Sequence, residues 1–454
     1  MSLITRRIIF YILVVLFFII ATAIILYSYG WTIDIAKCDI FTGKNFQNQL
    51  KELKNCSLKI QKTGAIYVET KPKDVLIKID GKIYKDKSGL IQSGTLIDNL
   101  RPKIHKVEIS KTGYLPWLKN LEVRPELVAE AQNIFLIPEK IEKELISIPR
   151  LRGNEIEAIS GKGDKFIIKD SPSEIFYLYN FEDLKSIFNV NLNFKNIRGV
   201  PSIKKAVFHP FEPNKLIIET AKGLDIIDTL RLKTENITKN QPALWLIQNS
   251  NVFFIKQTAI NKTPKTKTPT YGVYSFNLII KNETLEAEID NPALAPKNLL
   301  KFGVSPSGGK IAVLNNSGNL YIYNSAQQNW DKKGSNIENF AFSPDSKKIA
   351  FWDKDKKLNI LFLEDWKSDI PKKEGDIIKL VLQNNPLKIE WYKNSYHLLI
   401  TYPAELKIME IDYRDPVNSY PLIQRNGNEF LYSPDSDFIY FIEEKNLYRI
   451  GLTK

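Results

Sequence analysis

The stretches FGVSPSGGKIAVL (302–314), FAFSPDSKKIAFW (340–352) and FLYSPDSDFIYFI (430–442) are three copies of one pattern. Each copy begins as an apolar strand, runs into Ser-Pro and a few polar residues, and continues as a second apolar strand. Serine at the first position, proline at the second and glycine or serine at the fourth suit the backbone of a type I turn. The pattern therefore predicts two antiparallel strands joined by a tight turn, with a third apolar strand following.

Weaker copies of the pattern fill the gaps between the clear ones and bring the number of repeats to seven. They are AISGKGDKFIIK (158–169), VFHPFEPNKLIIE (207–219), WLIQNSNVFFIK (245–256) and IEWYKNSYHLLIT (389–401). A small β unit that recurs about every 40–50 residues is typical of the blades of a β-propeller. We predict an all-β chain in which residues 139–454 form a propeller of about seven blades, with six or eight as the alternatives.

The two ends of this repeat region complement each other. After Tyr432 the last repeat has only three strands before Lys454, and KELISIPRL (143–151) precedes the first repeat. We expect the segment at about 143–151 to supply the outer strand of the last blade, because this pairing would leave no open sheet edge between the first and last blades.

The motif Ser-Pro-Asp-x-x-x-Ile-Ala-Phe, at 343–351, resembles the WD-like (WD40-like) repeat of TolB-type propellers and of the propeller in prolyl oligopeptidase relatives. The resemblance implies the fold. It assigns no role, because the same fold carries many functions.

Residues 63–138 show short alternating strands separated by turn residues, which predicts a small β-sandwich. GAIYVETKP (64–72) and VLIKIDGK (75–82) alternate apolar and polar positions, and Asp80-Gly81 is a tight hairpin signal. The segment resembles the PEGA domain, a bacterial surface module with a transthyretin-like sandwich. The residues that carry the resemblance are Gly64, Val68, Pro72, Val75, Asp80, Gly81, His105, Val107, Gly113, Tyr114 and Leu136. It implies a binding or spacer module outside the cell.

Residues 8–29, IIFYILVVLFFIIATAIILYSY, carry no charge. As a helix they would extend about 33 Å, which matches a hydrocarbon core of about 30 Å. Arg6 and Arg7 favour a cytoplasmic N-terminus. We predict that residues 1–30 are a cytoplasmic tip and a single-pass signal anchor in the cell membrane, with the bulk of the chain extracytoplasmic. The alternative is a signal peptide cleaved near Ala21-Thr22-Ala23.

Cys38 and Cys56, the only cysteines, lie in a juxtamembrane segment, residues 31–62. Outside the cytoplasm such a pair can form a disulfide that contributes about 3 kcal/mol. The alternative is two unpaired buried thiols.

The net charge is +13, which suits an anionic cell-envelope polymer, although Lys-rich composition also results from an AT-rich genome. Nucleic acid is not expected beside a membrane anchor. One stretch, KQTAINKTPKTKTPTYG (256–272), predicts a long basic loop. Its candidate binding residues are Lys256, Lys262, Lys265 and Lys267, and the alternative is a soluble loop without a ligand.

The sequence shows no catalytic motif. It contains no G-x-S-x-G or H-E-x-x-H pattern and no phosphate-binding glycine loop. Its three histidines are His105, His209 and His397, all of which have structural explanations. Asp345 and Asp435 are expected to form turns. We therefore predict no catalytic residue, no cofactor, no metal and no enzyme.

These observations predict a bacterial, membrane-anchored, extracytoplasmic binding or scaffold protein whose propeller interacts with an unknown protein or a cell-envelope glycan. The alternative is an envelope-associated enzyme, or enzyme subunit, that acts on wall glycan or peptide. Two or three carboxylates converging on the central channel of the propeller would distinguish the enzyme.

Overall fold

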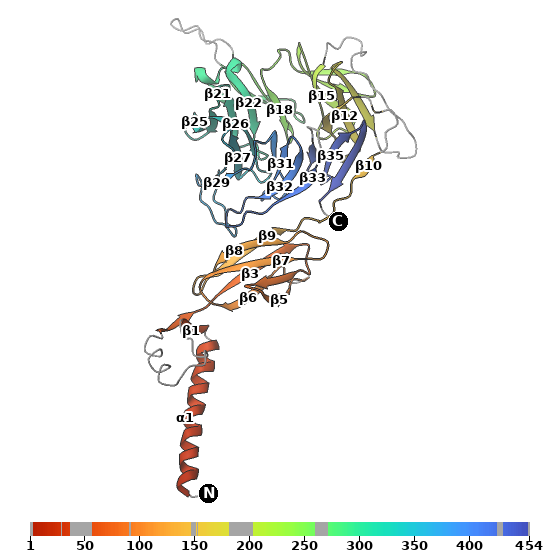
Figure 1. Cartoon of the computed structure of the whole chain (residues 1–454). Helices are drawn as coiled ribbons and strands as arrows, with labels where there is room; N and C mark the ends of the chain where they lie inside the picture. The colour runs from red at the N-terminus through yellow and green to blue at the C-terminus, as the bar shows by residue number, and fades with distance from the viewer. Residues whose placement is uncertain are drawn as a thin grey trace. The chain divides into compact units, whose positions relative to one another are not determined.

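The N-terminal helix α1, Leu3–Ser28, is long and apolar enough to cross a membrane (Figure 1). Within the described part of the structure, the side chains of its apolar stretch are not buried. A signal sequence has the same length and composition, so α1 is a candidate membrane span or signal sequence. The helix ends where Gly30, with a φ of +75°, donates its N–H to the carbonyl oxygen of Tyr27 at 3.0 Å.

The computed structural model describes residues 3–28, 30–36, 57–89, 92–146, 151, 153–180, 203–258, 271–424 and 430–452. The chain divides into two compact units. The first unit comprises Met1–Glu139, Lys367–Ile370 and Arg414–Pro416. The second unit comprises Lys140–Trp366, Pro371–Tyr413 and Val417–Lys454.

The first unit contains a hairpin and a β-sandwich after α1. In the hairpin, β1 (Trp31–Ala36) pairs antiparallel with β2 (Ser57–Lys62). One sheet of the sandwich has the order β6-β3-β9 and the other has the order β5-β4-β7-β8. Their strands are β3 (Gly64–Lys71), β4 (Leu76–Ile79), β5 (Lys82–Lys85), β6 (Thr95–Leu100), β7 (Ile104–Ser110), β8 (Trp117–Glu122) and β9 (Val128–Phe135).

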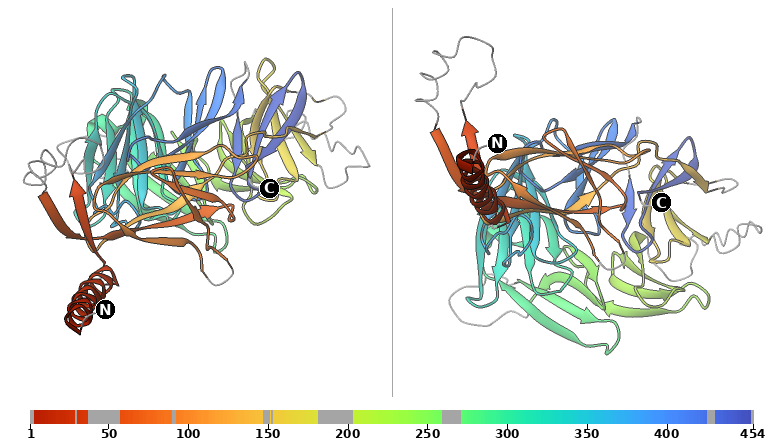
Figure 2. Two further views of the ribbon diagram at one scale, coloured as in Figure 1. Left: turned by 60° about the horizontal axis from the view of Figure 1, so that its bottom comes forward. Right: turned by 90° about the horizontal axis from the view of Figure 1, so that it is seen from below.

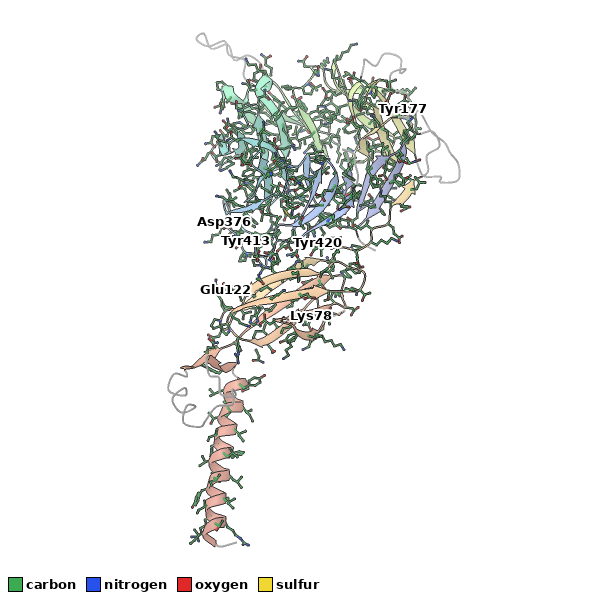
Figure 3. The ribbon with its side chains drawn as sticks, viewed as in Figure 1. Lys78, Glu122, Tyr177, Asp376, Tyr413 and Tyr420 are labelled. Atoms are coloured by element: carbon green, nitrogen blue, oxygen red, sulfur yellow. The ribbon has the colours of Figure 1, made fainter. Side chains whose placement is uncertain are left out.

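Alternation of apolar and polar residues builds the core of this sandwich. Ile66, Ile77 and Val107 have no exposed area and pack in one cluster. On the other face of β4, Lys78 (labelled in Figure 3) pairs with Glu108 of β7 at 3.2 Å. The sandwich predicted for residues 63–138 is therefore present.

The second unit is a seven-bladed propeller, as the repeats predict. The strands of the first three blades are β11 (Glu155–Ile159), β12 (Lys165–Asp170), β13 (Ile175–Asn180), β14 (Ile203–Phe208), β15 (Lys215–Thr220), β16 (Gly223–Asp228), β17 (Thr234–Thr238), β18 (Trp245–Gln248), β19 (Asn251–Gln257), β20 (Tyr271–Asn277) and β21 (Glu283–Ile289). Two short 3-10 helices, η2 (Pro292–Leu294) and η3 (Pro296–Asn298), lead into the fourth blade.

The remaining four blades follow in chain order. Their strands are β22 (Leu299–Val304), β23 (Ile311–Asn315), β24 (Leu320–Asn324), β25 (Asn329–Gly334), β26 (Ile337–Phe342), β27 (Lys348–Asp353), β28 (Lys357–Phe362), β29 (Ile377–Val381), β30 (Lys388–Trp391), β31 (His397–Tyr402), β32 (Glu405–Glu410), β33 (Ser419–Gln424), β34 (Leu431–Ser433), β35 (Phe438–Glu443) and β36 (Asn446–Gly451).

Each Ser-Pro turn joins the first two strands of a blade. In the fourth blade the N–H of Gly308 donates to the carbonyl oxygen of Ser305. In the fifth blade the N–H of Ser346 donates to the carbonyl oxygen of Ser343 in the same way. Gly308 and Ser346 have φ values of +81° and +64°, which explains why Gly or a small polar residue occupies the fourth position.

The last blade contains a strand from the beginning of the propeller. β10 (Glu144–Ile146) pairs antiparallel with β36, and the sheet order is β10-β36-β35-β34. Figure 2 shows this blade, in blue, beside the first blade, in yellow. Phe166 of β12 and Tyr440 of β35 pack edge to face across this junction, with their ring centroids 5.1 Å apart.

Candidate functional site

The first strand of each blade faces the axis of the propeller, and together these strands line a central channel. The channel has a volume of about 960 Å³. Residues of β11, β14, β18, β22, β26, β30 and β34 contribute to its wall. Its size is at the upper end of the range of about 300–1,000 Å³ that is usual for small-molecule sites.

Among the residues that the structure describes, six ionisable side chains line this channel, three acidic and three basic. They are Glu155 and Glu157 of β11, Lys205 of β14, Lys301 of β22, and Lys388 and Glu390 of β30. None of the six is predicted from the sequence, although carboxylates that converge on the channel are the feature expected of the alternative, an enzyme.

A recurrent position within the blades delivers several of these side chains. Lys205, Lys301, Asn339 and Lys388 each lie four residues before the residue that begins the turn after the first strand. Just before the first three of them the strand register shifts by a β-bulge. Bulges of this kind redirect side chains, so a polar residue at this position can face the channel although its strand is otherwise apolar.

Lys301 is held by neutral oxygen atoms of the neighbouring blade. Its Nζ donates to Oδ1 of Asn339 at 2.5 Å and to the carbonyl oxygen of Phe340 at 2.7 Å. Burial lowers the pKa of the Lys301 ammonium to about 8; the nearby Lys388 adds to this effect, and Glu390 opposes it. Lys301 makes no ion pair with any residue that the structure describes.

Glu155 and Glu157 of β11 both line the channel, and the register of β11 against β12 shifts by a β-bulge between Ile156 and Ala158. Burial raises the pKa of the Glu157 carboxyl; Lys205 opposes the rise and Glu155 adds to it. Glu155 accepts a hydrogen bond from Oγ of Ser171 at 2.9 Å. Neither carboxylate forms an ion pair within the described ranges.

The other two lysines of the channel already have partners. Nζ of Lys388 lies 2.9 Å from Oε1 of Glu390 on the same strand. Nζ of Lys205 lies 4.8 Å from the ring centroid of Trp245, a cation–π distance. Among the described residues of the channel, the charges without an ion pair are therefore the β11 carboxylates and the ammonium groups of Lys301 and Lys205, of which Lys205 lies against an aromatic ring.

Lys256, the one predicted site residue that the structure describes, does not line this channel. Lys256 is on β19, where its Nζ lies 2.5 Å from Oε1 of Glu283 and 4.3 Å from the ring centroid of Tyr274. The other predicted site residues, Lys262, Lys265, Lys267, Cys38 and Cys56, lie outside the described residues.

The histidines and turn aspartates have structural contacts. The side chain of His105 hydrogen-bonds to Asp80 at 2.9 Å and to the carbonyl oxygen of Arg101 at 2.8 Å. His397 bonds to the side chain of Asn394, and Oδ1 of Asp345 accepts from Oγ of Ser343 at 2.5 Å. Among the residues that the structure describes, no group of three or more His, Cys, Asp or Glu side chains could hold a metal ion.

Solved structures share the fold, whereas no protein-family model and no curated protein matches the sequence. An oligogalacturonate lyase in complex with manganese is 11% identical, with a TM-score of 0.47, over 69% of this chain and 96% of that one. Hydrazine synthase of Kuenenia stuttgartiensis is 13% identical, with a TM-score of 0.43, over 67% and 97%. The Cps50 (Swd1) β-propeller domain of Myceliophteria thermophila is 10% identical, with a TM-score of 0.44, over 69% and 100%.

The prediction that the chain is not an enzyme, which rests on the absence of catalytic motifs, is wrong, because an enzyme, an oligogalacturonate lyase, is among the solved structures that resemble the chain. At 11% identity this likeness shows the fold alone and transfers no activity. The sheet topology makes the second unit a β-propeller, and its chemistry is inferred from the channel.

Proposed function

We propose that the protein is a membrane-anchored, extracytoplasmic binding protein whose propeller takes a polar ligand of the cell envelope, a peptide or glycan fragment, into its central channel. The observation that carries this proposal is the channel of about 960 Å³ with its six ionisable side chains. The sandwich, which resembles a PEGA domain, would serve as a spacer, and α1 would be the anchor.

The energetics of the channel support binding. Charged groups that are partly withdrawn from water are costly unless they are paired. Glu155, Glu157 and Lys301 make no ion pair within the described part of the chain. A polar ligand that hydrogen-bonds to these groups would replace the hydration that they have lost. The free energy gained in this way favours binding in the channel over binding on the outer surface.

Blocking the channel tests the proposal. Asn339 and Ala341 are half-buried on β26 and flank the buried Phe340, so Ala341 faces the channel. We expect Ala341→Trp to abolish binding of envelope fragments by the full chain in detergent micelles, measured by calorimetry. Ala326→Trp, at an exposed turn between β24 and β25, is the matched control. Equal binding by both variants would place the site elsewhere.

Catalysis is a second candidate function, and the raised pKa of Glu157 favours it. A carboxyl group whose pKa is raised is a better general acid than an ordinary surface carboxylate, and Glu155 supplies a second carboxyl group in the same channel. The test is turnover of wall glycan and peptide by the full chain. Glu157→Gln should abolish the turnover. If the variant retains full turnover, Glu157 is not the acid.

The orientation of the anchor is also part of the proposal. Arg6 and Arg7 precede the apolar stretch and favour a cytoplasmic N-terminus. We expect protease added to intact spheroplasts to degrade the propeller and leave a reporter fused before Met1 intact. Protection of the propeller would place it in the cytoplasm.

A further inference from the structure

The charges of the channel are arranged by sign around the ring of blades. The β11 carboxylates belong to the first blade, and the Lys301 ammonium belongs to the fourth. Contacts between first strands follow the blade order, with β11 next to β14 and β34, and β22 between β18 and β26. In a ring of seven, the first and fourth blades are on opposite sides. Glu157 and Lys301 therefore face each other across the channel rather than side by side.

The wall between the two charged regions is mixed, with apolar residues and also Lys205 on the second blade and Gln248 on the third. On the third blade the lining contains Leu246 and Ile247, and on the seventh it contains Phe430 and Leu431. Interactions through such walls are weakly screened, so each charged region keeps its own sign for a ligand in the channel. The remaining charges modify this pattern: Lys388 is paired with Glu390, and Lys205, which lies against Trp245, opposes the rise in the pKa of Glu157.

We propose that the channel recognises a ligand with an ammonium group at one end and a carboxylate at the other, with the ammonium at Glu155 and Glu157 and the carboxylate at Lys301. A short linear peptide with free termini has this chemistry. The inference rests on the proposed function, since it names the ligand class for the same channel.

Two further contacts support this assignment. Asn339 holds the Lys301 ammonium from the neighbouring blade, so the cation is positioned before a ligand arrives. Apolar side chains such as Phe342 line the wall between the charged regions and would contact the body of the ligand. A ligand that spans the channel would thus meet charge at both ends and apolar surface in between.

The experiment uses tetra-alanine as the probe, in four forms: with free termini, N-acetylated, C-amidated, and blocked at both ends. Binding to the full chain in detergent micelles is measured by calorimetry at low ionic strength. We expect the free form to bind at least about tenfold more tightly than either singly blocked form, and the doubly blocked form to bind most weakly. Equal affinity of all four forms, or no binding by any of them, would overturn the inference.

Variants assign each end of the probe. Lys301→Met should remove the preference for the free over the amidated form and keep the preference for the free over the acetylated form. Glu155→Gln combined with Glu157→Gln should have the reverse effect. Lys379→Met, on the exposed outer strand β29, is the control and should change neither preference.

The outcomes separate this inference from the proposed function. One outcome is that a neutral glycan fragment binds wild type and Lys301→Met with the same affinity and does not bind Ala341→Trp. This outcome would support the channel as a binding site. The same result would refute recognition of an ammonium and a carboxylate. If Ala341→Trp leaves tetra-alanine binding unchanged, both the channel site and its ligand class fail.

Discussion

Nζ of Lys348 lies 2.7 Å from Oδ2 of Asp345, and the lysine side chain has no exposed area. Asp345 belongs to the Ser-Pro turn of the fifth blade, and Lys348 begins the strand β27 that follows the turn. The same Nζ lies 3.2 Å from the ring centroid of Trp366. Burial lowers the pKa of Lys348 to about 8, and Asp345 opposes the shift. Burial thus disfavours the charged form of Lys348. We therefore expect the packing of its aliphatic stem, rather than its charge, to stabilise the propeller here.

Truncating this lysine should destabilise the propeller. We expect Lys348→Ala to lower the free energy of unfolding by about 3 kcal/mol, because it leaves a cavity beside Trp366 and a carboxylate without its cation. Lys348→Met keeps the packing and should cost less than half as much. Lys310→Ala, at the same position of the fourth blade and half-buried, is the control, with an expected change within about 0.5 kcal/mol. Urea unfolding of the full chain in micelles measures each value; equal losses for Ala and Met would contradict the argument.

His209 should make the stability of the second blade sensitive to acid. Its Nδ1 accepts the backbone N–H groups of Phe211 at 3.3 Å and Glu212 at 3.1 Å. Burial lowers the pKa of His209 below its usual value of 6.5. Below 6.5 the unfolded chain binds the proton more readily than the folded chain, so stability falls as the pH falls from 6.5 towards the folded-state pKa. Above 6.5 this contribution is fully present.

The control for this prediction comes from other blades. Ser305 and Ser343 occupy the position of His209 in the fourth and fifth blades, so His209→Ser should retain the turn without a titrating group. Urea unfolding of wild type and His209→Ser between pH 7.5 and pH 5 should show a smaller loss of stability in the variant. Parallel pH profiles would show that His209 does not contribute.

The fold could be predicted from the sequence because its turns have local chemical causes. Ser305 and Ser343 begin turns whose fourth residue has a positive φ, and the sequence records this requirement directly as Gly308 and Ser346. Turn signals recur between the first two strands of the blades, although not every turn has a positive φ at its fourth residue, so the number of blades follows from counting the repeats. The apolar α1 is equally local, since its length alone makes it a candidate span.

The channel could not be predicted in the same way, because its charged residues come from strands far apart in the sequence. Glu157 and Lys301 meet the same cavity only after the blades close into a ring. A signal was nevertheless present. Lys205, Lys301 and Lys388 are polar residues four positions before a turn, in strands that are otherwise largely apolar. The basic stretch at 256–272 drew attention instead, although its Lys256 is paired with Glu283.

Gly81 should be specifically required in the sandwich. It has a φ of +82° in the hairpin between β4 and β5, where Asp80 has a φ of +49°. A Cβ at Gly81 would meet no atom within 4 Å, so backbone conformation alone opposes a side chain there. Gly81→Ala should cost about 1–2 kcal/mol. Gly89 also has open space and no positive φ, so Gly89→Ala should stay within about 0.5 kcal/mol in the same unfolding measurement. Equal losses of stability in Gly81→Ala and Gly89→Ala would show that the positive φ of Gly81 is not the cause.

Closure of the propeller through β10 gives the last prediction. Ile146 of β10 is 8% exposed and packs in the core between the last and first blades, whereas Leu145 is 52% exposed. Glu144 also pairs with Arg449 of β36 through bonds of 2.7 and 2.8 Å, but their side chains remain 58% and 30% exposed.

Exposed ion pairs contribute at most about 1 kcal/mol, whereas loss of a buried isoleucine costs about 2–5 kcal/mol. We therefore expect Ile146→Ala to lower the free energy of unfolding of the full chain by about 3 kcal/mol. Leu145→Ala and Glu144→Gln should each lower it by less than 1 kcal/mol. If Glu144→Gln were as damaging as Ile146→Ala, the ion pair rather than the apolar contact would hold the ring closed.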